Sequence, residues 1–206
     1  MKARVCAVLL VFGLIAALSG CAGSKIYLME VQYIAEKKAA PTATMVGICP
    51  FEDVREDTDK DLVGVRHHGK KYVDLFKLEG VSLSEAVTQA VRDHFTDNGS
   101  KVTDCKGWDG SPEGLDRLPR DLDTVIGGKI DSFMIEAKSG VSITTVSYTI
   151  KMRVLIGKIE ERKVVIRTVE SMPRDKTVGF DPEWIKGKLN SIVTEALQKL
   201  LAESLV

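Results

Sequence analysis

Residues 145–156, Thr-Val-Ser-Tyr-Thr-Ile-Lys-Met-Arg-Val-Leu-Ile, decide the fold class of this 206-residue chain. Apolar side chains occupy every second position from Val146 to Ile156, and mostly polar side chains lie between them. A period of two is typical of a β-strand with one buried face and one wet face, as found in antiparallel sheets. We therefore expect a half-buried antiparallel strand here, with residues 163–171 paired to it as a long hairpin.

Two segments have the pattern of amphipathic helices. Ser82-Leu83-Ser84-Glu85 is a capping box in front of an apolar stripe that recurs at helical spacing over residues 83–95. Asp181-Pro182 begins a final helix, whose apolar stripe covers residues 185–201. His94 lies in the last turn of the first helix, where a charged imidazole would complement the helix dipole.

Shorter strands and one loop complete the pattern. Because runs of strands alternate with only two main helices, the order predicts an α+β fold. We expect a mainly antiparallel sheet, with both helices packed on one face, in a single domain over residues 25–206. The expected strands are residues 25–33, residues 45–49 stopped by Pro50, a hairpin of residues 63–66 and 72–78, residues 101–105, and residues 124–136 with a Gly127-Gly128 interruption; residues 108–123 are expected as a loop with a helical turn near 115–118.

The first twenty residues have the pattern of a secretory signal peptide. Lys2 and Arg4 precede an apolar run of 13 residues, 5–17, which is shorter than the roughly 20 residues that a membrane-spanning helix needs. Small residues then lead to Cys21. The alternative, a short membrane anchor or a buried helix, fits this length and these flanks less well. We therefore assign residues 1–20 to the signal peptide and residues 21–24 to a short tether.

Leu18-Ser19-Gly20-Cys21 resembles the lipobox of bacterial lipoproteins. The resemblance implies cleavage before Cys21, a thioether-linked diacylglyceryl group on its sulfur and acylation of its new amine. Ala22 stands where an Asp would resemble a retention signal for the inner membrane. This indicates the outer membrane of a Gram-negative bacterium, with the domain facing the periplasm. Three residues separate Cys21 from the first expected strand and span about 10 Å, so the domain should sit close to its leaflet.

Composition excludes several functional classes. The chain has 29 basic and 29 acidic residues, and a net charge of zero argues against a nucleic-acid binder that acts through bulk charge. The motifs GxxxxGK[ST], GxSxG and HExxH are absent from the sequence. We therefore expect no catalytic residues, no metal, no cofactor and no nucleic-acid partner, and we expect the lipid anchor to hold the protein at the membrane.

Besides the lipidated Cys21, two cysteines remain in the mature chain in an oxidising compartment, Cys49 and Cys105. Both lie at the ends of short expected strands with one helix between them. A βαβ unit can place such ends side by side, so a disulfide is one interpretation, and two buried thiols are the other. No CxxC motif occurs, which argues against redox chemistry and against a cysteine zinc site.

A local basic patch lies at the tip of the expected hairpin, in Arg66-His67-His68-Gly69-Lys70-Lys71. Arg66, Lys70 and Lys71 are candidate contacts to anionic lipid head groups or to a partner protein. The alternative is a solvated hairpin tip, the usual role of a short charge run. Adjacent histidines point to opposite faces of a strand, so His67 and His68 do not predict a metal site.

Four carboxylates lie within residues 52–57, on either side of Arg55. A paired-carboxylate hydrolase needs two such groups fixed across a cleft. Here they crowd one turn, so we expect a solvated loop or a local pair between Arg55 and one of the acids.

Residues 50–57, Pro-Phe-Glu-Asp-Val-Arg-Glu-Asp, resemble the PFxDxR segment of YajG-type lipoproteins. Asp123-Thr124-Val125-Ile126-Gly127-Gly128-Lys129-Ile130 resembles a second motif of that family, and the order of elements over residues 45–206 is similar. The resemblance implies an outer-membrane lipoprotein without established enzymatic activity, with an α+β domain similar to the N-terminal domain of TolB. Ile26-Tyr27-Leu28, soon after the lipid cysteine, resembles the auxiliary lipoproteins of ABC-type lipid transporters.

We therefore expect a non-enzymatic adaptor or assembly component of the cell envelope, with an envelope protein as its partner. The wet strand face over residues 145–153 and the basic hairpin tip are its candidate contact surfaces. The alternatives are a lipid-transport auxiliary, which predicts an apolar groove and an inner-membrane ATPase, and an envelope hydrolase, for which no nucleophile and base are found. A homo-oligomer stays open, because ring-forming secretion lipoproteins use α+β domains of this kind.

Overall fold

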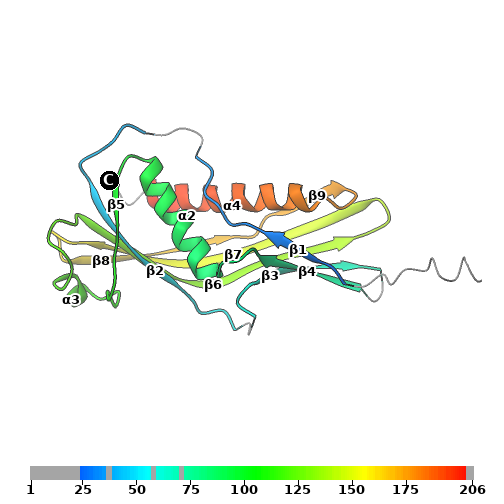
Figure 1. The fold of residues 1–206 in the computed structure, drawn as a ribbon, viewed down its shortest axis with the longest axis horizontal. Coiled ribbons are helices and arrows are strands. Elements are labelled where there is room, and N and C mark those ends of the chain that lie inside the picture. Colours follow the sequence, from blue (N-terminus) through cyan, green and yellow to red (C-terminus); the bar gives the residue numbers. More distant parts are fainter. Residues whose placement is uncertain (1–23, 36–38, 57–58, 70–71, 203–206) are drawn as a thin grey trace, which may run out of the picture.

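A long β-hairpin forms the spine of the molecule (Figure 1). In the computed structural model, which describes residues 24–35, 39–56, 59–69 and 72–202, β6 (Thr124–Ser139) pairs antiparallel with β7 (Ile143–Lys158). The apolar side chains at alternate positions from Val146 to Ile156 are all buried. The half-buried strand predicted from the sequence is therefore confirmed.

Two groups of shorter strands lie along the outer edge of β6. β2 (Met45–Asp53) runs parallel to its first half, and β5 (Lys101–Asp104) extends the sheet beyond β2. β3 (Leu62–His68) runs parallel to the second half of β6. It is followed outward by β4 (Tyr72–Leu78), its antiparallel hairpin partner, and by β1 (Ile26–Met29), which is parallel to β4.

The outer edge of β7 is shared in the same way. β8 (Lys163–Ser171) pairs with the second half of β7, and β9 (Arg174–Val178) pairs with its first five residues. The result is a nine-stranded mixed sheet in which the longest ladders are antiparallel.

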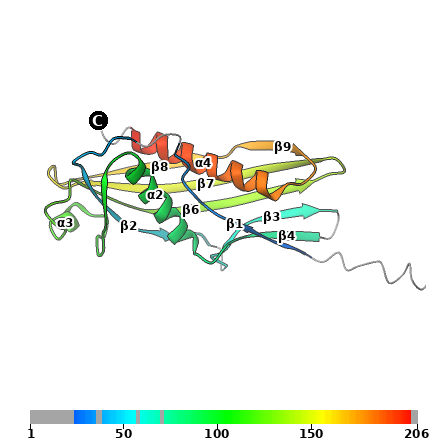
Figure 2. The ribbon, with the colours of Figure 1, turned by 45° about the horizontal axis from the view of Figure 1, so that its top comes forward.

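Both main helices lie over one face of this sheet (Figures 1 and 2). α2 (Leu83–Asp97) begins with the predicted capping box, and α4 (Pro182–Ala202) directly follows Asp181, whose Oδ1 accepts the amide of Glu183. The predicted α+β fold, with a mainly antiparallel sheet and two helices on one face, is confirmed. The main core fills the space between these layers, and its largest side chains, each at most 1% exposed, are Phe51, Phe76, Phe95, Phe133 and Tyr148.

The first strand is shorter than its apolar pattern suggested. Residues 30–35 leave the sheet and cross toward α4. There the amide of Gln32 donates to Asn190 Oδ1 at 3.0 Å, and the amide of Ile34 donates to Thr194 Oγ1 at 2.9 Å. Side chains of a helix thus replace a neighbouring strand as backbone partners, which explains why Asn190 and Thr194 are buried.

The prediction that Pro50 stops its strand is wrong, because β2 continues to Asp53. The pairing of β2 with β6 shifts register between Ile48 and Phe51, so the proline lies at an interruption of the ladder. A proline has no amide to donate and is tolerated at such a place. At the facing Gly128, a Cβ would collide with the carbonyl oxygen of Arg153, so this glycine marks close packing.

Two small elements differ from expectation. The helical turn in the loop is α3 (Pro112–Leu115), earlier than predicted, because Ser111 caps it through the amide of Gly114. β9 has no apolar alternation in the sequence Arg-Asp-Lys-Thr-Val, so periodicity gave no signal for it.

Candidate functional site

Segments that are distant in sequence meet at one end of the molecule, which we call the hairpin end (Figures 1 and 2). It consists of residues 24–26, 66–69, 72–74, 138–143 and 176–180. The register pairs His68 with Ser139, and Ile143 with Val178, so the tips of both hairpins and the end of β9 lie together. β1 begins here as well, because Ile26 pairs with Leu75 near the start of β4.

Asp74 is the centre of a polar cluster at the hairpin end. Its carboxylate is 1% exposed, and it accepts the Lys25 amide at 2.8 Å and Arg66 Nη1 at 3.0 Å. His68 Nε2 lies 3.1 Å from Oδ1. Burial alone would raise the pKa of Asp74, but the hydrogen bonds from Lys25 and His68 and the charge of Arg66 hold it below its ordinary value. The start of the described chain is thereby fixed to the β3–β4 hairpin.

Arg66, one of the predicted contact residues, takes part in this cluster. Besides binding Asp74, its Nε donates to Ser139 Oγ at 2.9 Å, and its guanidinium carbon lies 3.6 Å from the centre of the Phe180 ring. Its side chain is 15% exposed. A contact role for Arg66 outside the molecule stays a prediction, and Lys70 and Lys71 lie outside the described residues.

Arg55 and Asp53, from the PFxDxR segment, form a buried clasp. Arg55 Nε and Nη2 bind the two carboxylate oxygens of Asp53 at 3.0 and 2.9 Å. The guanidinium also donates to three backbone carbonyl oxygens, at distances between 2.8 and 3.2 Å. Burial would raise the pKa of Asp53, and the hydrogen bonds and charge of Arg55 outweigh it and lower that pKa. The predicted local pair is confirmed, and the three carbonyls belong to Lys60, Leu62 and Phe133.

Cys49 and Cys105 meet far from the hairpin end. Their Cα atoms are 4.5 Å apart, and the structure joins them in a disulfide. Cys105 directly follows β5, whereas Cys49 lies inside β2 and not at its end. Both are buried in a second, smaller core, which includes Leu115, Leu118, Leu122 and Val125.

His94 does not carry the charge that its place in the helix suggested. The ring is 5% exposed and packs edge-on against Tyr33 and Phe95. Burial lowers the pKa of His94 to about 4, against a smaller opposing effect of Asp97. The imidazole is therefore neutral at neutral pH, and the interpretation of His94 as a cation at the helix terminus is wrong.

On the face of the sheet away from α2 and α4, polar side chains follow β7 from Thr145 to Arg153, and we call this part the open sheet face. Thr145, Ser147, Thr149 and Lys151 are half-buried there, and Arg153 is exposed, so the predicted wet face is confirmed. Ion pairs connect neighbouring strands across it. Lys129 Nζ lies 2.8 Å from Glu52 Oε2, and Arg153 Nε donates to Asp131 Oδ2 at 2.8 Å. Beyond the open sheet face, Trp108 and Leu115 pack over Gly157, where the second core begins.

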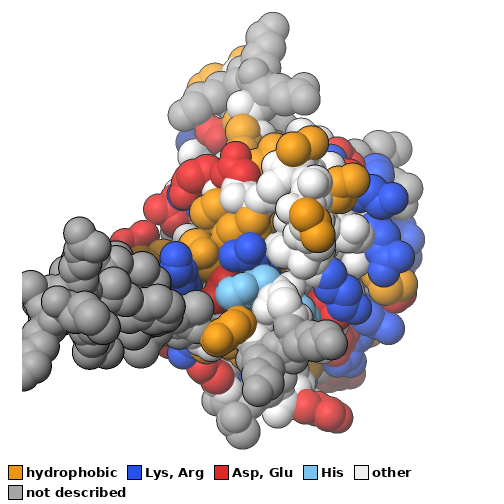
Figure 3. Space-filling model, turned by 90° about the vertical axis from the view of Figure 1, so that its right-hand side faces the viewer, with side chains coloured by type: hydrophobic (Ala, Val, Ile, Leu, Met, Phe, Trp, Pro, Cys, Tyr) orange, Lys and Arg blue, Asp and Glu red, His pale blue; other side chains and the backbone are white. Residues whose placement is uncertain are grey.

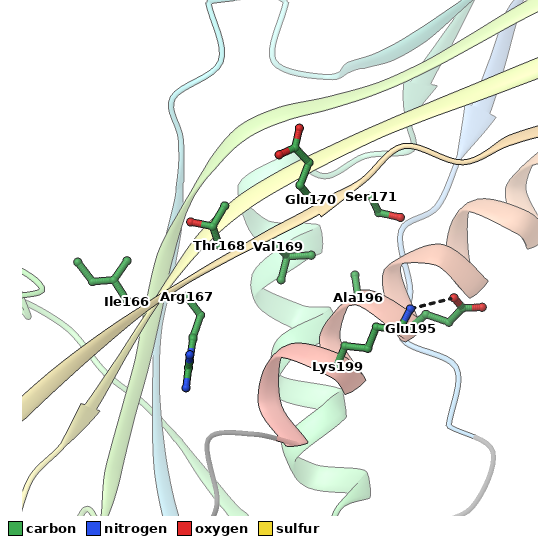
Figure 4. Close-up of a pocket in the computed structure, with 9 residues that line it drawn as sticks. All are labelled: Ile166, Arg167, Thr168, Val169, Glu170, Ser171, Glu195, Ala196 and Lys199. Atoms are coloured by element: carbon green, nitrogen blue, oxygen red, sulfur yellow. Dashed lines mark ion pairs between the residues drawn. The ribbon is translucent and has the colours of Figure 1, made fainter.

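Two grooves lie beside the helices. One, of about 450 Å³, separates the edge strand β8 from the last turns of α4 (Figure 4). Glu195 and Lys199 form an ion pair of 4.0 Å on its α4 side. The other, of about 560 Å³, lies between residues 29–33 and the start of α2 and is bordered by several carboxylates. No group of three metal-ligating side chains occurs within the part of the chain that the structure describes.

Comparisons with known proteins find solved structures with a similar fold and no related sequence. No family model matches the chain, and no curated protein matches it. The protein XCC0632 from Xanthomonas campestris, described with the family model DUF330, is 11% identical, covers 85% of this chain and 91% of its own, and superposes with a TM-score of 0.50. At that identity the similarity shows a shared fold alone.

Two further solved structures are more distant. The lipoprotein GNA1162 from Neisseria meningitidis is 8% identical, with 76% of this chain and 99% of its own covered and a TM-score of 0.39. The PelC dodecamer from Paraburkholderia phytofirmans is 10% identical, with 80% and 93% covered and a TM-score of 0.41. Separately, none of the helices in the described residues is both long and apolar enough to cross a bilayer.

Proposed function

We propose that this chain is a bacterial lipoprotein, held by Cys21 at the periplasmic side of the outer membrane, that acts as a non-enzymatic adaptor of the cell envelope. The short, fixed connection at the hairpin end supports this proposal. Lys25, four positions after Cys21, already has its amide bound to Asp74. A lipid on Cys21 would therefore hold the domain in a defined orientation. A lipid joined to the domain through a long flexible linker would leave the orientation free.

The observation that carries the adaptor role is the open sheet face. α2 and α4 lie over one side of the β6–β7 hairpin (Figure 2), and on the other side the polar side chains of residues 145–153 are half-buried or exposed. Its cross-strand ion pairs hold the polar side chains in place without covering them. Interfaces that form and dissociate are about as polar as ordinary protein surface, so this face suits a protein partner.

The resemblance to YajG-type lipoproteins belongs to this proposal. One motif of that resemblance, PFxDxR, contains Arg55 and Asp53, whose contacts are internal and span β2, β6 and the start of β3. A motif with such a structural role would recur among proteins because they have the same fold. It would not identify the partner.

The second candidate, an auxiliary lipoprotein of an ABC-type lipid transporter, has one observation in its favour. The groove between residues 29–33 and α2 has an apolar floor that includes Met29, Val31 and Ala86. Its border carries Glu30, Glu79, Glu85 and Asp93. Carboxylates repel the phosphate of a phospholipid, and for this reason we place the adaptor role first.

The adaptor role can be tested by photo-crosslinking in cells. A photoreactive amino acid is placed at Thr149 on the open sheet face, and a matched one at Ser191, an exposed position on α4. We expect a stoichiometric protein adduct, identified by mass spectrometry, from position 149 and not from position 191. Equal adducts from both positions, or none from 149, would contradict the role of the open face. A transporter subunit captured from Gln89 in the groove would favour the second candidate.

A further inference from the structure

Exposed apolar side chains lie at several places on the hairpin end, between polar and charged ones (Figure 3). Val141 is fully exposed at the turn between β6 and β7, and Val178 is 88% exposed at the end of β9. Ile143, which pairs with Val178, is 52% exposed. Ile26 at 59% and Tyr72 at 43% belong to the same end. Large apolar side chains grouped at one tip of a soluble domain indicate a surface that is covered by something else.

These side chains are presented on an ordered backbone. The amide of Gly140 donates to the Ile143 carbonyl oxygen at 2.8 Å, which closes the β6–β7 turn. The amide of Gly179 donates to the Ser142 carbonyl oxygen at 2.9 Å and ties the end of β9 to that turn. Little conformational freedom is left to lose when the tip is covered, so contact there costs little ordering entropy.

Cations lie directly behind the apolar tip. Lys138 and Lys176 both pair with Thr145, two residues along β7 from Ile143, which is a distance of about 7 Å. Lys176 is exposed, and the Lys138 side chain is 64% exposed although it pairs with Glu136 at 2.9 Å. Within the residues that define the hairpin end the acid is Asp74, which is buried, while Asp175 pairs with Lys188 of α4 and Asp181 is exposed at the start of α4.

We propose that the hairpin end docks into the same lipid leaflet that holds the acyl chains of Cys21. Val141, Ile143 and Val178 would enter the acyl boundary, with Lys138 and Lys176 at the depth of the head groups. We assign a membrane as the occupant because the chain from Cys21 to Ser24 can reach at most about 10 Å, so a lipid on Cys21 would keep this end at the leaflet. The inference rests on the proposed lipid anchor and adds a second, lipid-independent contact to it.

The test uses the mature chain with Cys21→Ser, so that no acyl chain contributes to binding. Its partition onto vesicles of phosphatidylethanolamine with a minority of phosphatidylglycerol is measured by co-sedimentation, with phosphatidylcholine vesicles for comparison. The double variant Val141→Asp/Val178→Asp is expected to lower the partition coefficient about tenfold or more. The matched control is Ile166→Asp, a 63% exposed side chain on β8 away from the hairpin end, and it should bind like the parent.

Three outcomes would overturn the proposal. The first is a parent chain that binds neither kind of vesicle, and the second is an equal loss of binding in the Ile166→Asp control. The third is a parent chain that forms an oligomer in the absence of vesicles, when the double variant is a monomer. Thermal unfolding of each variant checks that the fold is retained, which the full exposure of Val141 and Val178 makes the expected result. The lipid anchor is tested separately by labelling Cys21 with a fatty-acid analogue, so failure of either idea can be told from failure of the other.

Discussion

Loss of the Arg55 side chain should destabilise the fold strongly. Arg55→Ala removes the guanidinium from three carbonyl oxygens and from the buried carboxylate of Asp53, which keeps only the amide of residue 55 at 3.1 Å and Lys60 at 3.8 Å. Breaking a buried ion pair on one side typically costs about 3–5 kcal/mol, and we expect a loss of that size in the free energy of unfolding by urea. Arg167→Ala, an exposed position on β8, is the matched control and should change stability by less than about 0.5 kcal/mol. Similar losses in both variants would refute the clasp.

His94 should make the stability of the fold depend on pH between about pH 4 and 6.5. Its pKa is about 4 in the fold and 6.5 in the unfolded chain, so the unfolded state takes up the proton first on acidification. The contribution of neutral His94 to the free energy of unfolding is complete above pH 6.5. It is lost as the pH falls toward 4, and the total loss is about 3 kcal/mol. The lowered pKa of Asp74 means that its own contribution is lost only at lower pH.

The pH effect is measured as the free energy of unfolding in urea at steps between pH 4 and 7. In His94→Phe the slope across this window should flatten, since Asp97, Tyr33 and the other neighbours remain. An unchanged slope in that variant would assign the effect to another group.

Among the elements, β2 and the end of β5 are joined by the Cys49–Cys105 disulfide across 56 residues of sequence. Closing a loop of that length in the unfolded chain stabilises the fold by about 4 kcal/mol in the chain-entropy description. We expect dithiothreitol to lower the thermal midpoint of the parent chain and to have no effect on Cys49→Ala/Cys105→Ala. A parent chain that is insensitive to reductant and shows free thiols by mass spectrometry would contradict the bond.

Helix and strand bounds were predicted wrongly where they depend on contacts between residues that are distant in sequence. The spine strands and both helices were predicted because burial on one face imposes a period that the sequence displays. β1 was overextended to residue 33 because residues 30–33 continue the pattern of the strand, whereas the amide of Gln32 binds Asn190, which is distant in sequence. β2 was cut short at Pro50 because a register shift is a property of the pair of strands.

The candidate sites were predicted where one segment forms them and missed where several segments come together. The wet strand face was predicted from residues 145–153, since it is one strand with one period. The apolar tip of the hairpin end was missed, because Tyr72, Val141 and Val178 come from three separate segments. Each is unremarkable alone, and only the topology brings them together.

At the scale of the whole molecule, the short connection to Cys21 should set which end faces the membrane. A photoreactive residue at Val141 is expected to form lipid adducts in the lipidated protein, and one at Glu160, in the turn at the other end of β7, is not. Inserting about ten Gly and Ser residues before Ser24 adds a reach of about 18 Å and frees the orientation. The ratio of adducts at 141 to those at 160 should then fall, while fatty-acid labelling of Cys21 stays intact. A ratio that the insertion leaves unchanged would show that the tether does not orient the domain.

The pairing of β1 with β4 also has a mechanical consequence. β1 starts at the hairpin end and runs inward, beside the parallel strand β4, so a pull on the N-terminus acts along the strand axis. The hydrogen bonds between Ile26–Met29 and their partners would then carry the load together, in shear, where a perpendicular pull would open them one after another. The bond from the Lys25 amide to Asp74 is the first to be strained. A domain attached in this way resists extraction forces better than its four-residue first strand suggests.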